Sequence, residues 1–276
     1  MRTRLIAVSA LALLAWIAAG IVLAEGSLHP PRLPSTAEVE IRSDDAIPLR
    51  ASFRRASSAV DCVIVLHGIG DSSRGALGFA PMFLEAGYHV LAPDSRAHGV
   101  SGGALVTFGV LESGDVLRWA AWLTQHAGCR KLFALGESLG GSILIQAAAQ
   151  QPVFSAIVAE CPYQDLQSIA EHRVAQQSSA WIAKPAVASA LLYTRLRYNL
   201  DLTRASTIQA ARRLQTPLLL IHGLADTNTP PSHSQAIAAV NSSIVTWYVP
   251  GAPHVAASAT QPEEFRRRVL AWLRPR

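Results

Sequence analysis

Short apolar runs that recur along the chain constrain its fold more than any other feature of the sequence. Each run is continuous rather than alternating, which is typical of strands buried on both faces of a parallel sheet. Segments with apolar residues at helical spacing lie between them. The predicted central strands are residues 62–66, 88–92, 131–135, 155–159, 217–221 and 244–249. Strands that alternate with helices in this way predict an α/β fold with helices on both faces of the sheet.

Composition and charge narrow the class of protein further. The chain has 276 residues, and 50% of them are hydrophobic, which is ample for a large buried core. Residues 39–42 and 48–53 flank a turn-prone Ser-Asp-Asp segment and predict a hairpin at one edge of the sheet. The net charge of +5 comes from scattered basic residues without a dense basic stripe, so nucleic acid is not an expected partner.

The first segment of the chain predicts a membrane partner. After Arg2 and Arg4, residues 5–24 carry no charge, and an α-helix needs roughly 20 residues to cross a bilayer. Two interpretations stay open, an uncleaved anchor or a signal peptide cut after Ala24. The run exceeds the roughly 7–15 apolar residues of a signal peptide, which favours an anchor with the catalytic domain on the extracytoplasmic side. A secreted or periplasmic protein is the alternative.

Segment boundaries and cysteines follow from composition. We expect residues 1–27 to form the anchor or signal segment, residues 28–37 a Pro-rich linker, and residues 38–276 the folded domain. The three cysteines cannot all pair within one chain. A bridge between Cys62 and Cys129 is conceivable in an oxidising compartment, but buried free thiols are the expected state.

A glycine-flanked serine marks the candidate nucleophile. Gly136-Glu137-Ser138-Leu139-Gly140 lies where the predicted strand 131–135 gives way to a predicted helix, 142–150. In a Gly-x-Ser-x-Gly turn the serine takes a strained backbone conformation, and the glycines let strand and helix pass closely. The hydroxyl of Ser138 would then project from the tip of the turn.

A serine nucleophile needs a base, and the base needs an acid to fix its tautomer. Asp226 follows the strand 217–221, and His254 follows the strand 244–249. Catalytic groups of open α/β sheets collect at the carboxyl ends of the strands, so both should lie near Ser138. His67 and His222 precede glycines at strand ends and are expected to be structural turn residues, His233 lies near a helix start, and His98 lies in a loop. None of these four follows the last strand, where the base should be.

The chemistry also needs two backbone N–H donors for the oxyanion of the tetrahedral intermediate. Leu139, directly after the serine, would supply one, and Ile69 in the loop after the strand 62–66 would supply the other. The sequence has no paired metal ligands such as His-x-x-x-His, no phosphate-cradling loop and no dinucleotide motif. We therefore expect no metal and no cofactor.

Five motifs in this order resemble the α/β-hydrolase superfamily over residues 38–274. They are His67-Gly68-Ile69-Gly70, the Asp-x-Arg-x-His-Gly-x-Ser loop that starts at Asp94, the Gly136–Gly140 turn, Asp226 and His254. The chain is similar to bacterial serine aminopeptidase, monoglyceride lipase-like and dienelactone hydrolase-like branches. The resemblance implies a mostly parallel eight-stranded sheet flanked by helices, with a small helical cap inserted after strand 6, at about residues 162–214.

The resemblance implies a serine hydrolase that cleaves a carboxylic ester or a lipid-like acyl ester through an acyl-enzyme. A peptidase or amidase of the serine aminopeptidase type and a non-catalytic binding protein are the alternatives. We expect Glu137 to be a solvated or salt-bridged carboxylate, and His98 to have no catalytic role. Apolar side chains of the cap are candidates for an acyl pocket or for packing: Trp181, Leu191, Leu192, Tyr193 and Leu196.

Overall fold

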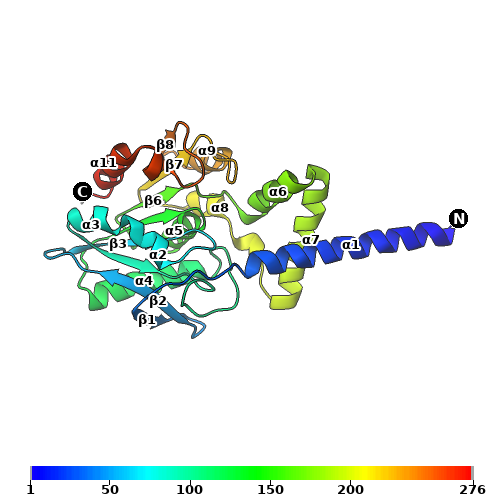
Figure 1. The fold of residues 1–276 in the computed structure, drawn as a ribbon, viewed down its shortest axis with the longest axis horizontal. Helices are drawn as coiled ribbons and strands as arrows, with labels where there is room; N and C mark the ends of the chain where they lie inside the picture. The colour runs from blue at the N-terminus through cyan, green and yellow to red at the C-terminus, as the bar shows by residue number, and fades with distance from the viewer. Residues whose placement is uncertain (1, 275–276) are drawn as a thin grey trace.

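A computed structural model describes residues 2–274, with side chains from residue 14 onward, and contains a single eight-stranded sheet (Figure 1). The strand order is β1-β2-β4-β3-β5-β6-β7-β8. β1 pairs with β2 and β2 with β4 in antiparallel fashion, and all other neighbours are parallel, as the sequence predicted. The strands are β1 (Val39–Arg42), β2 (Pro48–Arg54), β3 (Asp61–Leu66), β4 (Tyr88–Pro93), β5 (Leu132–Glu137), β6 (Ala156–Glu160), β7 (Leu218–Gly223) and β8 (Val245–Val249).

Helices cover both faces of the sheet, because alternate side chains of each strand point to opposite faces. On β3, Ile64 belongs to the hydrophobic cluster that contains Trp119 of α4, whereas Val65 belongs to the cluster that contains Phe83 of α3. Both faces of the central strands are therefore buried. The covering helices are α2 (Ser73–Ala76), η1 (Leu77–Phe79), α3 (Ala80–Glu85), α4 (Glu112–His126), α5 (Leu139–Gln150), α8 (Thr207–Ala211), α9 (Ser232–Ala239), α10 (Ala257–Thr260) and α11 (Pro262–Trp272).

A helical insertion separates β6 from β7. It holds α6 (Leu166–Gln177), α7 (Ala180–Tyr198) and η2 (Leu202–Arg204) before α8, and α6 and α7 stand away from the sheet beside α1 (Figure 1). The second of these helices, α7, contains Pro185 in its interior. The function of the insertion as a cap stays a prediction.

The C-terminal part of the N-terminal helix α1 (Arg2–Leu28) packs on α7. A Cβ atom on Gly20 would lie 2.5 Å from the Cβ of Ser189, so the two helices cross closely there. Leu28 is fully buried, and its carbonyl accepts a hydrogen bond from the N–H of Val106 at 3.0 Å. Leu28, the first residue of the predicted Pro-rich linker 28–37, therefore packs against the domain.

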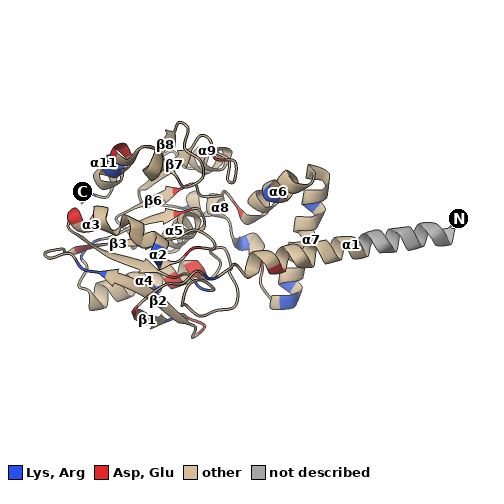
Figure 2. Cartoon of the chain, viewed as in Figure 1, with Lys and Arg blue, Asp and Glu red and all other residues tan. Residues whose placement is uncertain are grey.

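The predicted anchor, residues 5–24, lies partly outside the residues whose side chains are described. Among the residues that the structure describes, no helix combines the length and the apolar character that a membrane span requires. The anchor and the signal peptide both stay predictions. In the described part of the chain, Lys and Arg residues are dispersed over several elements, as expected from the sequence (Figure 2).

The cysteines differ from the expected free thiols. Cys62 and Cys129 form a disulfide with their Cα atoms 5.7 Å apart, and Cys161 is a buried free thiol. The pairing follows from the sheet, since Cys62 lies on β3 and Cys129 precedes the neighbouring strand β5. The N–H of Cys62 donates to the carbonyl of Lys131 at 3.0 Å, which brings the two segments together.

Candidate active site

Ser138 occupies the sharp turn between β5 and α5. Its φ of 50° lies in the left-handed region, and its N–H donates to the carbonyl of Glu160 at 2.8 Å. A Cβ atom on Gly136 would lie 2.5 Å from the carbonyl carbon of Gly140, and one on Gly140 would lie 2.5 Å from the carbonyl oxygen of Leu66. The strand and the helix approach too closely for side chains, so the surroundings hold the serine in its strained conformation.

The structure brings the three predicted residues together at the carboxyl ends of β5, β7 and β8. His254 Nε2 lies 3.0 Å from Ser138 Oγ, and His254 Nδ1 lies 2.6 Å from Asp226 Oδ2. A carboxylate only accepts hydrogen bonds, so the proton of a neutral imidazole is on Nδ1. Nε2 is then the acceptor for the hydroxyl proton of Ser138.

Asp226 is buried and fully hydrogen-bonded. Its Oδ1 accepts the N–H groups of Asn228 and Thr229, both at 2.9 Å. Burial by itself would raise the pKa of Asp226, but the hydrogen bonds from His222, His254 and Thr229 outweigh it and hold the pKa well below its usual range. The group is thus a carboxylate throughout the neutral pH range, as an orienting acid requires.

His222 is the residue of the site that sequence reasoning missed. We expected a turn residue, but it lies on β7, is fully buried, and contacts the acid. Its Nε2 lies 2.7 Å from the carbonyl oxygen of Thr229 and 3.3 Å from Asp226 Oδ2, and its Nδ1 lies 2.7 Å from Ser234 Oγ. The signal in the sequence was the spacing, since His222 precedes Asp226 by four residues at a strand end.

The predicted oxyanion donors, Ile69 and Leu139, both border the cavity at Ser138. Leu139 is the first residue of α5, where a helix leaves its N–H groups without an intrahelical partner. The loop of Ile69 passes behind the serine, where a Cβ atom on Gly68 would lie 3.6 Å from the Cβ of Ser138. Within residues 14–274, no hydrogen bond from either N–H is found. Their role stays a prediction.

Two buried histidines hold the loop of Ile69. His98 Nε2 accepts the N–H of Gly70, and His67 Nε2 accepts the N–H of Ser95, both at 3.1 Å. Burial, followed by the proximity of His98, lowers the pKa of His67 to about 4, so this ring is neutral at physiological pH and can accept. These contacts agree with the structural positions that the sequence indicated.

Two cavities of about 460 Å³ each meet at Ser138 and Arg173. The apolar cavity, as we name it, is bordered by residues that include Ile69, Leu139, Tyr163, Leu166, Ile169 and Val174. The polar cavity is bordered by residues that include Asp71, Glu137, Gln176, Asn228 and His254. A substrate carbonyl at Ser138 would therefore have an apolar space on one side and a polar space on the other.

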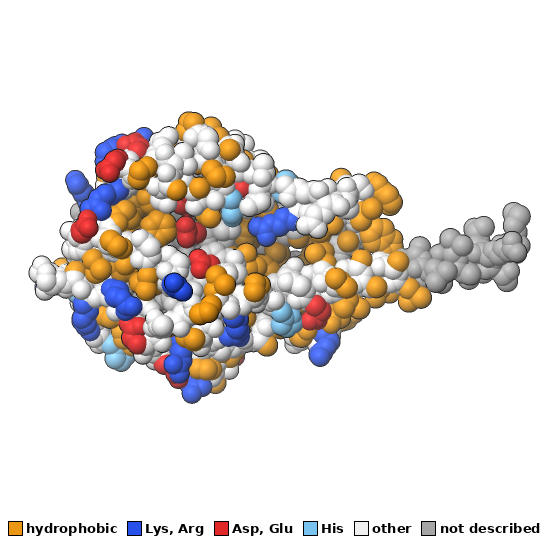
Figure 3. Space-filling model, viewed as in Figure 1, with side chains coloured by type: hydrophobic (Ala, Val, Ile, Leu, Met, Phe, Trp, Pro, Cys, Tyr) orange, Lys and Arg blue, Asp and Glu red, His pale blue; other side chains and the backbone are white. Residues whose placement is uncertain are grey.

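The cap residues named as candidates for an acyl pocket or for packing do not border the apolar cavity. Trp181, Leu192 and Leu196 are 74%, 57% and 78% exposed, and hydrophobic side chains cover the lobe that α7 forms with the adjoining part of α1 (Figure 3). Tyr193 instead donates its hydroxyl to Glu25 at 2.7 Å. Within the cap, the residues that border the apolar cavity belong to α6 and not to α7.

Glu137 also differs from expectation. Its side chain borders the polar cavity, and no salt bridge to it occurs among the described residues. Burial raises its pKa to about 8, and the nearby carboxylates of Glu160 and Asp71 add to the rise. The environment therefore favours the neutral form of Glu137 beside Ser138, in place of the solvated or salt-bridged carboxylate that we expected.

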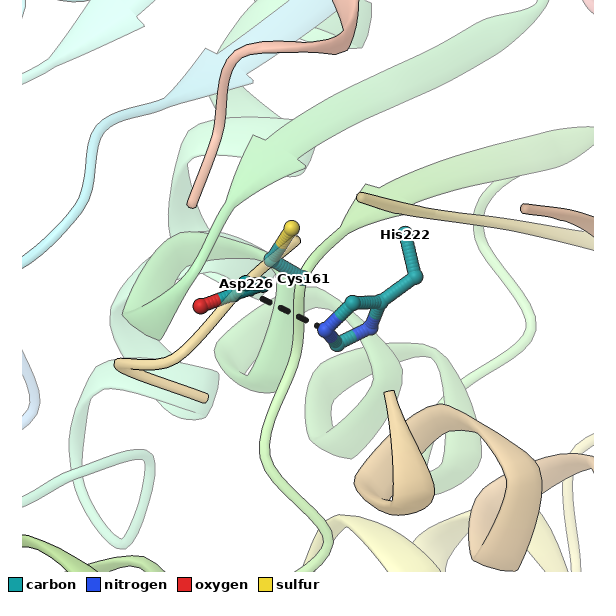
Figure 4. A group of neighbouring side chains, drawn as sticks. All are labelled: Cys161, His222 and Asp226. Atoms are coloured by element: carbon teal, nitrogen blue, oxygen red, sulfur yellow. Dashed lines mark ion pairs between the residues drawn. The ribbon is translucent and has the colours of Figure 1, made fainter. Parts of the chain in front are cut away.

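One group of potential metal ligands lies behind the site, formed by Cys161, His222 and Asp226 (Figure 4). Their ligand atoms lie within 4.8 Å of one another. Both nitrogens of His222 and both oxygens of Asp226 already take part in hydrogen bonds, and burial raises the pKa of the Cys161 thiol. The donors therefore fit a hydrogen-bonded support of Asp226 better than a metal site.

Comparisons with known proteins agree with this geometry. The model of the alpha/beta hydrolase fold family matches residues 61–207. Esterase Pf2001 of Pyrococcus furiosus is 26% identical with a TM-score of 0.72, over 89% of this chain and 98% of that chain. A hydrolase of Pseudomonas aeruginosa PA01, 21% identical with a TM-score of 0.63 over 86% and 98% of the two chains, shares the fold.

A curated relative also matches part of the chain. The protein YqkD of Bacillus subtilis (strain 168) is 26% identical over 180 residues, which are 63% of this chain and 58% of YqkD. The chain thus matches less than two thirds of the length of that relative.

Proposed function

The chain belongs to the alpha/beta hydrolase fold family, and from this premise we propose that it is a serine hydrolase that cleaves carboxylic esters through an acyl-enzyme on Ser138. The observation that carries the proposal is the hydrogen-bonded chain from Asp226 through His254 to Ser138, at 2.6 and 3.0 Å. The similarity to esterase Pf2001 supports an ester as the substrate.

In the proposed reaction, Ser138 Oγ attacks the ester carbonyl while His254 Nε2 takes its proton. Asp226 holds the imidazolium in place, and the N–H groups of Ile69 and Leu139 stabilise the oxyanion. The tetrahedral intermediate then expels the alkoxide, which leaves as an alcohol with the proton from His254. Water attacks the acyl-enzyme in the same way, releases the carboxylic acid and restores the serine hydroxyl.

The two cavities support an ester with an apolar acyl group and a polar alcohol. The acyl group would lie in the apolar cavity, beside Ile169 of α6, and the alcohol in the polar cavity, beside Asn228. A second candidate, an amidase, is favoured by one observation. Asp71 borders the polar cavity, where a carboxylate could accept the amino group of an aminoacyl amide. A substrate panel should therefore contain both acyl esters and aminoacyl amides.

Replacement of the nucleophile tests the proposal. We expect Ser138→Ala to lower kcat for p-nitrophenyl acetate by roughly 10³-fold or more, because the nucleophile acts as a unit with its base. A fluorophosphonate probe should label the wild-type protein and fail to label this variant. The matched control is Ser52→Ala, which removes another buried serine hydroxyl, on β2.

The control should keep full activity and labelling. Circular dichroism spectra should show all three proteins folded. Retained turnover in Ser138→Ala would contradict the proposal. Folded wild-type protein that the probe does not label would instead favour a non-catalytic binding protein.

We also propose that the N-terminal apolar run anchors the protein in a membrane through the residues that precede its contact with α7 at Gly20, with the catalytic domain on the extracytoplasmic side. The Cys62–Cys129 disulfide supports this placement, because disulfides persist in oxidising compartments. In intact spheroplasts of a bacterial host, added protease should degrade the catalytic domain and spare a cytoplasmic marker. A domain that survives until lysis would contradict the placement.

A further inference from the structure

One wall of the apolar cavity comes from the N-terminal helix. Leu23 and Ser27, four residues apart on α1, border the cavity together with Pro30 and Pro31 from the segment that follows. The opposite wall is formed by α6, including Leu166. The α1 wall lies outside residues 61–207, which the family model matches, so it belongs to the part of this chain that the family pattern does not cover.

Contacts on three sides fix this wall in place. The carboxylate of Glu25 accepts hydrogen bonds from the hydroxyl groups of Tyr193 and Tyr198 on α7, both at 2.7 Å. Leu28, one residue beyond Ser27, is fully buried in the core. Arg32 donates to the carbonyl of Ser101 at 2.5 Å. The last turns of α1 are thus part of the domain, and cleavage after Ala24 would remove Leu23 from the wall.

The apolar space continues beyond the cavity. A smaller cavity of about 40 Å³ lies between α1 and α7 and is bordered by Val187 and Leu191. It shares Leu23, Ser27 and Leu166 with the apolar cavity. Leu23 and Ser27 therefore stand at the junction of the two spaces, at the position where an acyl chain that starts at Ser138 would enter the region between the helices.

We infer that α1 is a specificity-determining element of the acyl site, with Leu23 and Ser27 setting the length of the acyl chain. The substrate class is then an ester of a straight-chain fatty acid that reaches past this junction. The inference rests on the proposed ester hydrolysis at Ser138. Each methylene that finds an apolar site contributes about a fourfold gain in kcat/KM, so a block at the junction has a steep effect on long chains.

Two variants of the full-length protein with opposite expected effects test the inference. Ser27→Phe should fill the junction, and Leu23→Ala should widen it. On p-nitrophenyl acetate, butyrate, octanoate and laurate, Ser27→Phe should lower kcat/KM for laurate at least tenfold more than for acetate. Leu23→Ala should raise the ratio of kcat/KM for laurate to that for butyrate. Val22→Ala, at a position that is 73% exposed on the same helix, is the control and should change neither.

The outcomes separate this inference from the proposed function. Unchanged chain-length profiles in both variants, or equal losses on all esters, would overturn the inference while ester hydrolysis stands. A wild-type protein that turns over no ester would refute the proposed function instead. In that case the role of the α1 wall is tested by the affinity for dansyl-undecanoic acid. Ser27→Phe should weaken this affinity at least tenfold. Equal binding by the wild-type protein and Ser27→Phe would overturn the inference.

Discussion

At the scale of single residues, the notable arrangement is a carboxylate shared between two histidines. Asp226 Oδ2 faces both His254 at 2.6 Å and His222 at 3.3 Å, and its Oδ1 is occupied by two backbone N–H groups. His222 is itself held by Thr229 and Ser234. Both oxygens of the carboxylate are thus engaged, which restricts its rotation. We expect His222 to act as a positioning residue for Asp226.

Removal of the His222 ring should therefore affect turnover more than substrate binding. We expect His222→Phe to lower kcat roughly 10- to 100-fold with little change in KM, because a hydrogen bond to a charged group contributes about 1.5–3 kcal/mol. His222→Gln keeps a donor near the carboxylate and should retain more activity than His222→Phe. Steady-state kinetics on p-nitrophenyl acetate measure both.

A matched control separates positioning from stability. His89 is also buried, and its Nδ1 accepts the N–H of Ala56 at 3.0 Å. It lies on β4, whereas His222 lies on β7. His89→Phe should lower the unfolding temperature and leave kcat unchanged. If His222→Phe and His89→Phe both lose stability and both keep kcat, His222 has a structural role only.

At the scale of helices and strands, the sheet and its turns could be predicted from local patterns. The predicted strand 62–66 differs by one residue from Asp61–Leu66, and the predicted 217–221 lies within two residues of Leu218–Gly223. A short, continuous apolar run is typical of a strand that is buried on both faces of a sheet. The turn at Ser138 was predictable for a similar reason, since a Cβ atom on Gly140 would collide with the backbone of Leu66.

The elements that escaped prediction depend on contacts between segments far apart in the chain. Local sequence patterns do not predict the contacts between α1 and α7. These are the close approach of Gly20 to Ser189 and the hydrogen bonds from Tyr193 and Tyr198 to Glu25. The docking of α1 was therefore missed, and with it the correct wall of the apolar cavity. Composition alone also cannot show that Leu28, the first residue of the predicted linker, is buried.

At the scale of the whole molecule, the site concentrates buried acids at one edge of the sheet. Glu160 on β6 pairs in register with Glu137 on β5 and is fully buried. Its Oε1 accepts the N–H of Ala257 at 2.9 Å, and its Oε2 has no hydrogen-bond partner among the described residues. Burial raises the pKa of Glu160 from 4.5 to about 7, so the folded protein keeps this side chain protonated where the unfolded chain does not.

This difference makes the stability of the molecule depend on pH. Between pH 4.5 and about 7 the folded state holds a proton that the unfolded state releases, so the contribution of Glu160 to the free energy of unfolding falls as pH rises and is constant above that window. The fall amounts to about 3 kcal/mol. Glu160→Gln keeps an acceptor for the Ala257 N–H and cannot ionise. We expect it to match the wild-type protein near pH 4.5 and to exceed its stability by up to about 3 kcal/mol at pH 8.

Urea denaturation of both proteins at pH 4.5, 6 and 8 measures the effect. The charge of Glu160 contributes to the raised pKa of Glu137, so the difference between the two curves reports Glu160 together with its effect on Glu137. Glu263→Gln, on the exposed face of α11, is the control and should follow the wild-type curve at every pH. Curves for Glu160→Gln and the wild-type protein that stay parallel across this range would mean that Glu160 is ionised in the folded state. The buried carboxylate of Glu160 would then need a partner that compensates its charge.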